Sequence, residues 1–385
     1  MGLAGRAVLT MAKTSSVVLP PFADPLLMWY DRNKRDLPWR ADPTPYRVWV
    51  SEIMLQQTRV EAVKPYYFRF LAALPTVHAL AACPPDTLHK LWEGLGYYSR
   101  VRNLQRAAEL ICRDYGGELP RDPETLKKLP GIGSYTAGAI ASFAYGVPAP
   151  AVDGNVLRVL ARLLADRRDV TDPRVKADYE AAVFAALPAD RPGDYNQALI
   201  EVGATVCGPN TSPACAACPL VGVCRAHAEG IEDELPYRAK KKARKIEKRT
   251  VLLVTDGARY LIHRRPGSGL LADLWEFPAL AGHAPTAEVA AYMEELGFSP
   301  RSVAEGKRAK HIFTHLEWEM TSYCIDTDFS HLATDSPFLR DERGNLTPSP
   351  AGDWMLATPA DIREVYPLPS AFSAFLTEIG GESPC

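Results

Sequence analysis

The apolar residues of this chain recur at helical spacing over about half of its length, and no other feature constrains the fold as strongly. From about residue 22 to 206 they return every three or four positions, in short segments separated by Pro and Gly. The stretch LHKLWEGLGYYSRVRNLQRAAELICRDYG is one example. This pattern predicts roughly ten short helices and no clear strand in that part of the chain.

The pattern changes beyond residues 231–249, a segment that contains the basic run RAKKKARKIEKR. The stretch TVLLVTDGARYLIHRR then holds two apolar or β-branched runs around Asp256-Gly257, which is a hairpin signal, and residues 315–325 alternate like a strand. We therefore expect a helical region at 22–230, a linker at 231–249 and a mixed α/β region at 250–378. The basic run is most simply a solvated linker; a contact to the DNA backbone or a nuclear-import-like signal is the alternative.

Length and composition are those of a globular chain. Its 385 residues suffice for two or three domains, and 47% of them are hydrophobic and 23% charged. We expect no membrane span, because no run of eighteen apolar residues occurs. Residues 1–21 lack a convincing secretory signal and are predicted to be a disordered extension. The net charge is -2, so any contact with nucleic acid requires a locally basic surface.

Four of the eight cysteines lie within eighteen residues, with the spacing Cys-x7-Cys-x2-Cys-x5-Cys. A disulfide framework would be unusual in a long chain without a secretory signal, whereas four thiolates so close together suit Zn²⁺ or an iron–sulfur cluster. Structural zinc sites usually show two CxxC-like pairs. Only one close pair occurs here, and this favours a cubane cluster. The predicted metal ligands are Cys207, Cys215, Cys218 and Cys224.

The stretch LPGIGSYTAGAI, residues 129–140, places Pro130, Gly131 and Gly133 in a tight turn just before a helix. Glycine is needed where the backbone comes close to a partner, and a helix N-terminus presents free N–H groups to phosphate. The pattern resembles the hairpin of a helix-hairpin-helix DNA-binding motif, predicted at about 125–146. Taken alone, it is equally consistent with a plain turn.

Two acidic residues stand at positions that are ambiguous in isolation. Asp153, in VDGNVLRVLARL, directly precedes an apolar-periodic helix and by itself is most simply an N-cap. Glu52, in SEIMLQQTRV, shares a helix face with Gln56 and Arg59, which by itself suggests a solvated surface. Neither residue is identified as catalytic by its local pattern.

Several ordered blocks together resemble the MutY family of adenine DNA glycosylases, from about residue 25 to 375. The blocks are RDLPWR (35–40), SEIMLQQT (51–58), WEGLGYYSR (92–100), LPGIGSYTAGAI, AVDGNVLRV, GLLADLWEFP (269–278) and HIFTHLEW (311–318). The resemblance implies an all-α helix-hairpin-helix glycosylase fold, a six-helix barrel with an iron–sulfur cluster domain, followed by a small α+β Nudix-like domain.

The resemblance also implies an activity, a cofactor and a partner. The expected enzyme excises adenine paired with 8-oxoguanine, or with G, from double-stranded DNA and carries a [4Fe-4S] cluster on the four cysteines. We expect a monomer, located in the nucleoid-containing cytoplasm of a bacterium or in the nucleus of a eukaryote. Two positions depart from the family pattern. The first cysteine gap has seven residues rather than the usual six, and Thr314 stands where the family has Ser.

The catalytic roles carry over to four residues. By the resemblance, Glu52 is expected to be the general acid aimed at adenine N7, since a buried carboxyl keeps its proton near neutral pH. Asp153 is expected to stabilise the oxocarbenium-like sugar electrostatically or through a transient covalent bond. Tyr135 is expected to hydrogen-bond near Asp153, and Asn155 to place the carboxylate and water. Related lyases carry a Schiff-base Lys where this chain has Tyr135, so we predict a monofunctional glycosylase.

The remaining predicted contacts are with DNA. Gln57 and Tyr97 resemble the family's intercalating residues, which fill the gap left by an extruded base. Gly131 and Gly133 belong to the DNA-binding hairpin. The predicted adenine pocket consists of Arg35, Trp39, Arg40, Leu55, Thr58 and Gln197. The predicted 8-oxoguanine recognition loop consists of Phe313, Thr314 and His315.

Two alternatives to this function remain from the sequence. One is an endonuclease III-like glycosylase-lyase, against which Tyr135 argues. The other is a catalytically inactive lesion-binding protein, against which the retention of Glu52 and Asp153 argues. Metal-dependent pyrophosphate hydrolysis by the Nudix-like domain is not expected, because GHAPTAEVAAYMEELGF lacks the Arg-Glu pair of the Mg²⁺-binding box.

Overall fold

The computed structural model describes residues 17–209, 212–239, 243–329, 339–340, 346–347 and 354–379. Most of the predicted N-terminal extension, residues 1–16, and residues 240–242 of the predicted linker lie outside this part. The chain divides into two compact units. The first combines Met1–Ala82 with Arg102–Lys241, and the second combines Cys83–Val101 with Lys242–Cys385.

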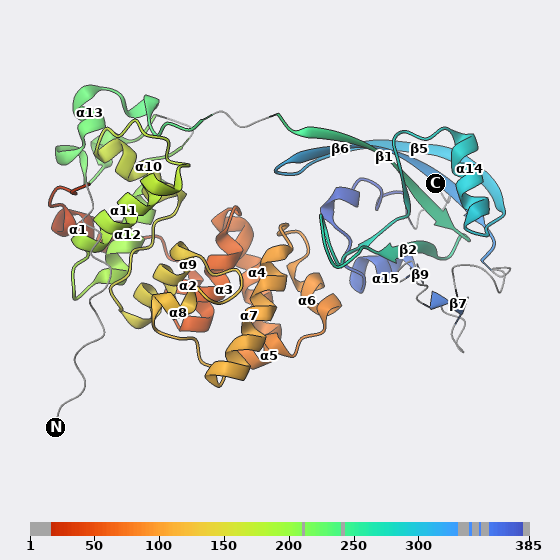
Figure 1. Cartoon of the computed structure of the whole chain (residues 1–385), viewed down its shortest axis with the longest axis horizontal. Helices are drawn as coiled ribbons and strands as arrows, with labels where there is room; N and C mark the ends of the chain where they lie inside the picture. Colours follow the sequence, from red (N-terminus) through yellow and green to blue (C-terminus); the bar gives the residue numbers. More distant parts are fainter. Residues whose placement is uncertain are drawn as a thin grey trace. The chain divides into compact units, whose positions relative to one another are not determined.

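Helices alone form the regular structure of residues 17–206, as the apolar spacing predicts. Twelve α-helices occur there, somewhat more than the ten expected, because several consist of a single turn (Figure 1). They are α1 (Ala23–Asn33), α2 (Pro38–Ala41), α3 (Pro45–Leu55), α4 (Val60–Ala73), α5 (Val77–Ala81), α6 (Pro85–Trp92), α7 (Ser99–Tyr115), α8 (Pro123–Leu126), α9 (Ser134–Ala139), α10 (Gly154–Leu163), α11 (Pro173–Ala186) and α12 (Pro192–Thr205).

Local sequence signals fix where the helices near the site begin. The Thr44 side chain accepts a hydrogen bond from the Arg47 backbone N–H at the start of α3. Gly131 adopts φ 76°, a left-handed conformation that favours glycine, in the hairpin between α8 and α9. Beyond Ala139, α9 continues as a π-helical turn over Ile140–Ala144. The predicted tight turn before a helix is thus confirmed.

One apolar core of the first unit joins α1, α10, α11 and α12. Its buried members include Tyr30 of α1, Val156 and Leu160 of α10, Tyr179 of α11 and Leu199 of α12. Burying such side chains stabilises the fold by about 1.5–3 kcal/mol each. This core holds the first turn of α10 against α12. After α12, two short 3-10 turns, Cys215–Ala217 and Val221–Val223, lead to α13 (Arg225–Glu229). Cys215 lies in the first turn, Cys218 directly follows that turn, and Cys224 directly precedes α13.

The second unit contains a seven-stranded mixed sheet with the order β3-β2-β1-β6-β5, to which β4 and β9 are added by pairing with β1 and β2. The predicted hairpin joins β1 to β2, with Thr255 opposite Tyr260, and the predicted strand at 315–325 is β6. β1 and β6 pair in parallel. The strands are β1 (Lys245–Thr255), β2 (Tyr260–Arg264), β3 (Trp275–Glu276), β4 (Ala279–Ala281), β5 (Pro300–Ile312), β6 (Leu316–Thr327) and β9 (Trp354–Ala357), with β7 (Leu339–Arg340) and β8 (Leu346–Thr347) as a separate pair.

Alternate residues of β1 enter two different apolar clusters. Val251 and Leu253 pack in one cluster with C-terminal residues such as Phe372, and Leu252 packs in the other with Met293 of α14 (Thr286–Glu295). This is the period-two pattern of a strand covered on both faces. Figure 1 shows α14 against the sheet. Among the described residues, none of the helices combines the length and the apolar character needed to cross a membrane.

Candidate active site

A cavity of about 660 Å³ opens in the helical unit, between α2, α3, the start of α9, the start of α10, and α12. A cavity of this size is ample for a purine nucleoside. It brings together most of the residues that the sequence predicts for catalysis and base binding. Those lining it are Arg35, Trp39, Arg40, Glu52, Leu55, Gln57, Thr58, Tyr135, Asp153, Asn155 and Gln197.

Glu52 lies in the last turns of α3 and is 6% exposed. The Tyr135 hydroxyl donates a hydrogen bond of 2.6 Å to Glu52 Oε2. Burial is the main cause that raises the pKa of Glu52 to about 7; the Tyr135 hydrogen bond opposes the shift, the Asp153 charge adds to it, and Arg40 opposes it. The carboxyl therefore retains its proton well above the usual range of a glutamate.

Asp153 is both the N-cap of α10 and a residue of the cavity. Its Oδ1 accepts hydrogen bonds of 2.8 Å from the backbone N–H groups of Asn155 and Val156, and its Oδ2 accepts one of 2.7 Å from the Asn155 side chain. Burial raises the pKa of Asp153, while these donors oppose the rise and favour the ionised form. The capping interpretation is confirmed, and the catalytic one stays a prediction for a side chain that also lines the cavity.

Tyr135 differs from the prediction in its partner. Its hydroxyl bonds to Glu52 and not to Asp153, although the charges of both carboxyls contribute to raising its pKa well above the usual value, after burial as the main cause. Tyr135 is the second residue of α9, directly after the hairpin, so its ring points from the helix start into the cavity. Tyr135 lines the cavity, as predicted, but its hydrogen-bond partner is Glu52 and not the predicted Asp153.

Glu201 is a residue that the sequence analysis missed. It lies on α12, fully buried, and binds both cavity arginines: Arg35 Nε at 2.7 Å and Arg40 Nη2 at 2.7 Å. Burial would raise the pKa of Glu201, but the hydrogen bonds from Arg35 and Arg40 outweigh it and hold the pKa below its usual value. Arg40 also donates to Gln197 Oε1 at 3.0 Å. A lone acid in the apolar stretch ALIEVGAT was the signal available for finding it.

Arg158 joins the first turn of α10 to the cysteine-containing segment. Its Nη2 donates to Asn155 Oδ1 at 2.8 Å and to the Gly203 carbonyl at 2.6 Å, and its Nε donates to the Cys207 carbonyl at 2.7 Å. Gly203 lies so close to α10 that a Cβ there would meet Asn155 Cβ at 2.6 Å. Asn155 is therefore held from two sides.

All four clustered cysteines line one small, mainly apolar cavity. The Arg162 guanidinium donates to Cys207 Sγ at 3.1 Å. Four converging sulfur donors fit a metal ion or an iron–sulfur cluster. The seven-residue gap after Cys207 is described except for residues 210 and 211.

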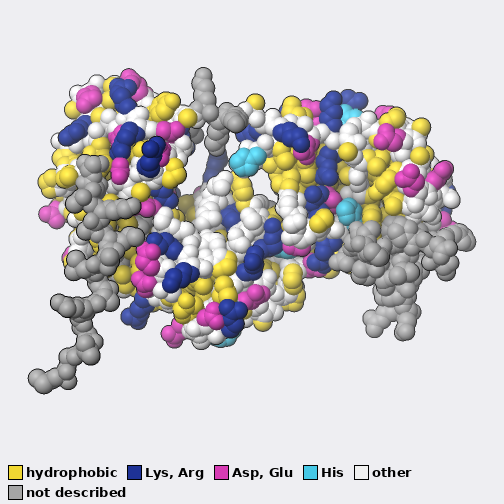
Figure 2. Space-filling model, viewed as in Figure 1, with side chains coloured by type: hydrophobic (Ala, Val, Ile, Leu, Met, Phe, Trp, Pro, Cys, Tyr) yellow, Lys and Arg dark blue, Asp and Glu magenta, His cyan; other side chains and the backbone are white. Residues whose placement is uncertain are grey.

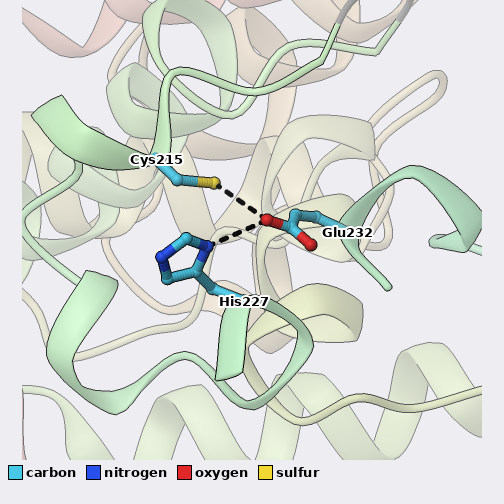
Figure 3. A group of neighbouring side chains, drawn as sticks. All are labelled: Cys215, His227 and Glu232. Atoms are coloured by element: carbon cyan, nitrogen blue, oxygen red, sulfur yellow. Dashed lines mark hydrogen bonds and ion pairs between the residues drawn. The ribbon is translucent and has the colours of Figure 1, made fainter. Parts of the chain in front are cut away.

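Figure 3 shows two further polar residues beside one of these thiols. Glu232 Oε1 lies 3.7 Å from Cys215 Sγ and 2.9 Å from His227 Nδ1. The three ligand atoms lie within 4.8 Å of one another, an arrangement that also suits a divalent cation. The donor set by itself therefore does not choose between zinc and a cluster.

Both predicted intercalating residues have left-handed backbone conformations. Gln57, just beyond α3, has φ 60° and is exposed; Tyr97 has φ 49° and is 46% exposed. A positive φ is uncommon for residues other than glycine, and such strain concentrates at functional sites. The backbone conformations of Gln57 and Tyr97 are an observation separate from the sequence resemblance by which the two residues were predicted.

The predicted recognition residues form the turn between β5 and β6. Phe313 packs edge-to-face against Trp318 with ring centroids 4.8 Å apart, and its backbone N–H donates to the Leu316 carbonyl at 2.9 Å. Thr314 Oγ1 lies 3.1 Å from the Tyr97 hydroxyl within the second unit. The His315 carbonyl accepts a hydrogen bond from the backbone of Lys245. None of the three predicted recognition residues is among those that line the cavity with Glu52.

Charged side chains of both signs are interspersed over the face seen in Figure 2. This distribution agrees with the small net charge of -2.

Comparisons with known proteins place both halves of the chain. Residues 50–183 match the HhH-GPD superfamily of base excision DNA repair proteins, and residues 250–378 match the NUDIX domain. The predicted fold class, a helical glycosylase fold followed by a Nudix-like domain, is confirmed. A solved structure of a thermostable thymine-DNA glycosylase has a TM-score of 0.50 and 28% identity, covering 54% of this chain and 95% of that one.

The matches to curated relatives cover more of the chain than either family match alone. The human adenine DNA glycosylase is 38% identical over 313 residues, covering 67% of this chain and 57% of the relative. The mouse adenine DNA glycosylase is 35% identical over 377 residues, covering 83% of this chain and 73% of the relative. The chain thus spans less than two thirds of the human relative's length. On the strength of these matches and the cavity described above, the chain belongs to the adenine DNA glycosylase family.

Proposed function

We propose that this protein is a monofunctional DNA glycosylase that removes adenine mispaired with 8-oxoguanine, or with G, from double-stranded DNA. The observation that carries this proposal is the pair of unlike carboxyls in one cavity. Glu52 is buried, with a pKa of about 7, and Asp153 accepts three hydrogen bonds that favour its ionised form. Pairs of acids in contrasting environments take opposite roles in glycosidic chemistry.

Glu52 acts as the general acid. Adenine leaves poorly as an anion, so the bond from C1′ to N9 breaks readily only when the base is protonated, and Glu52 delivers its proton to N7. The Tyr135 hydroxyl orients the Glu52 carboxyl through its 2.6 Å hydrogen bond. Arg35 and Arg40, held in place by Glu201, contact the extruded adenine together with Gln197, which accepts a hydrogen bond from Arg40.

Asp153 acts on the sugar. Departure of adenine leaves positive charge on C1′ and the ring oxygen, and the Asp153 carboxylate stabilises that cation electrostatically or by a transient covalent bond. Asn155 fixes Asp153 Oδ2 and helps to place the attacking water, whose addition at C1′ completes the hydrolysis. Tyr135 has no amine with which to form a Schiff base, so the abasic strand is left uncut.

The target base must leave the helix before it reaches Glu52. Gln57 and Tyr97, presented by left-handed backbone, fill the space that it vacates, while Gly131 and Gly133 bring the hairpin backbone close to phosphate. The turn that carries Phe313, Thr314 and His315 recognises 8-oxoguanine in the opposite strand. Such an enzyme works on chromosomal DNA, in the bacterial nucleoid or the eukaryotic nucleus.

We further propose that the four cysteines hold a [4Fe-4S] cluster. Supporting this are the convergence of Cys207, Cys215, Cys218 and Cys224 on one cavity and the charged Arg162 beside Cys207. Bound by these cysteines, a cluster would crosslink the segment that follows α12. Arg158 joins that segment to Asn155 through its hydrogen bonds to the Cys207 carbonyl and to Asn155 Oδ1. Arg225, exposed at the start of α13, is available there for a phosphate.

Single-turnover base release tests the function. The full-length protein is mixed with duplexes containing 8-oxoguanine:A, G:A or T:A, and free adenine is measured over time. We expect fast release from the first, slower release from the second and none from the third. Equal release from T:A pairs would refute the specificity, and borohydride trapping of a covalent DNA adduct would show a lyase instead. Tight mismatch binding without release over hours would identify a binding protein.

A further inference from the structure

The loop between α6 and α7 that carries Tyr97 is built from residues in unusual backbone conformations. Gly94, Gly96 and Tyr97 have φ values of 97°, 69° and 49°. The glycines adopt such angles at no steric cost, but Tyr97 does not. The surrounding structure must therefore supply contacts that hold Tyr97 in this conformation.

Arg100, in the first turn of α7, supplies several of those contacts. It is 8% exposed, and its Nη2 donates hydrogen bonds to the carbonyls of Leu95 at 3.0 Å and Gly96 at 3.1 Å. Its guanidinium lies over the Tyr97 ring at 5.6 Å and over the Trp92 ring at 5.3 Å. Burial lowers the pKa of Arg100 to about 10, so the side chain still carries its charge at neutral pH.

The same loop is tied at two other points. Trp92 Nε1 donates to the Gly96 carbonyl at 3.1 Å, and the Arg100 backbone N–H donates to the Tyr97 carbonyl at 2.9 Å. The Gly96 carbonyl is thus fixed by two donors, one from each flanking helix. Tyr97 itself remains 46% exposed, with its hydroxyl near Thr314. The arrangement holds the backbone rigidly and leaves the ring available.

We propose that Arg100 is a positioning residue for base extrusion: it holds the 94–97 loop so that the Tyr97 ring is ready to enter the DNA stack. This inference rests on the proposed function, because it takes Tyr97 as an intercalating residue. Both hydrogen bonds and both ring contacts described above join the Arg100 guanidinium to residues 92–97, which comprise the strained loop and the end of α6 before it. These contacts tie the position of the loop backbone to the Arg100 side chain.

Extrusion can be measured apart from chemistry in a Glu52→Gln background, in which adenine stays attached. The probe is a duplex with 8-oxoguanine opposite A and with 2-aminopurine next to that A, whose fluorescence rises when its neighbour leaves the stack. We expect Arg100→Gln to reduce the extruded fraction about tenfold, since a small displacement of a positioned group has effects of this order. Arg100→Lys retains the charge and one donor and should recover part of the loss.

Arg106→Gln is the matched control, because Arg106 is an exposed arginine on the same helix. Its extruded fraction should equal that of the parent. Binding of all variants to a duplex with an abasic analogue, which needs no extrusion, should agree within about twofold, and the melting temperature checks folding. Normal extrusion by Arg100→Gln, together with loss of extrusion by Tyr97→Ala, would overturn the inference. Absence of adenine release by the unmodified protein would instead refute the proposed function.

Discussion

The Tyr135 hydroxyl donates a 2.6 Å hydrogen bond to Glu52 Oε2 inside a cavity that also contains Asp153. Two effects meet at this carboxyl. Burial raises the pKa of Glu52, and the hydrogen bond, which is stronger to a carboxylate than to a neutral acid, lowers it. Tyr135 therefore limits how far the pKa rises, and it also fixes which oxygen is free to face the base.

Replacement of Tyr135 by Phe should move the pH profile of adenine release towards higher pH. Loss of the donor removes an interaction that lowers the pKa of Glu52, so the acid keeps its proton to a higher pH. The maximal rate should fall, because the carboxyl is less well oriented. Single-turnover rates between pH 5 and 9 provide the measurement. A falling limb that stays in place or moves to lower pH would contradict this assignment.

Glu52→Gln should abolish adenine release, by at least about a thousandfold, and should stabilise the protein at alkaline pH. The folded-state pKa of about 7 lies above the ordinary 4.5, so the carboxyl favours folding fully only below pH 4.5, and this contribution is lost as the pH rises through 7. The neutral amide avoids that loss, which amounts to about 3 kcal/mol.

The measurement for Glu52→Gln is the free energy of unfolding by urea at pH 4.5 and pH 8. The difference between variant and parent should be small at the lower pH and large at the higher. A difference that is the same at both values would mean that Glu52 is not buried as a neutral acid.

Asp153→Asn separates the capping role from the catalytic one. Asparagine caps helices about as well as aspartate, so the free energy of unfolding should change by no more than about 1 kcal/mol. The negative charge facing the sugar is lost, so adenine release should fall by at least about a hundredfold. Asp172→Asn, at the N-cap of α11, is the control and should leave release unchanged. If the Asp153→Asn protein releases adenine at the parent rate, Asp153 serves only as a helix cap and not in catalysis.

The purified protein should contain about four iron atoms per chain and absorb visible light. Cys218→Ser should lose both properties, because it removes one of four converging thiols. Cys112→Ser, on α7 and outside that group, should retain them. Stoichiometric zinc in place of iron would rule out the cluster but would still show that the cysteines bind a metal.

Thr314→Ala should reduce the preference for 8-oxoguanine:A over G:A by about fivefold, the value of one neutral hydrogen bond. Thr314→Ser retains the hydroxyl and serves as the matched variant, with a preference close to that of the parent. Dissociation constants for both duplexes, measured in the Glu52→Gln background, give the ratio. If Thr314→Ala leaves the ratio unchanged, the hydroxyl does not read the lesion.

Sequence reasoning located the helical and mixed halves because both depend on local periodicity, as the twelve helices and the β1–β2 hairpin illustrate. It could not find Glu201, whose role depends on Arg35, which lies 166 positions away in the sequence. Nor could it predict the left-handed conformations of Gln57 and Tyr97. The surrounding structure imposes these backbone angles, against the intrinsic preference of both residues. Long-range contacts also assign residues 83–101 to the second unit.

The closeness of Gly203 to Asn155 sets a limit on inherited variation at a position that has no reactive group of its own. Even the single methyl of alanine would collide with the asparagine that steadies Asp153. Since close-packed interiors transmit such displacements, the Gly203→Ala protein is expected to hold Asn155 and Asp153 less well, although every acid, base and thiol is intact. A judgement from the chemical similarity of glycine and alanine alone would miss this effect.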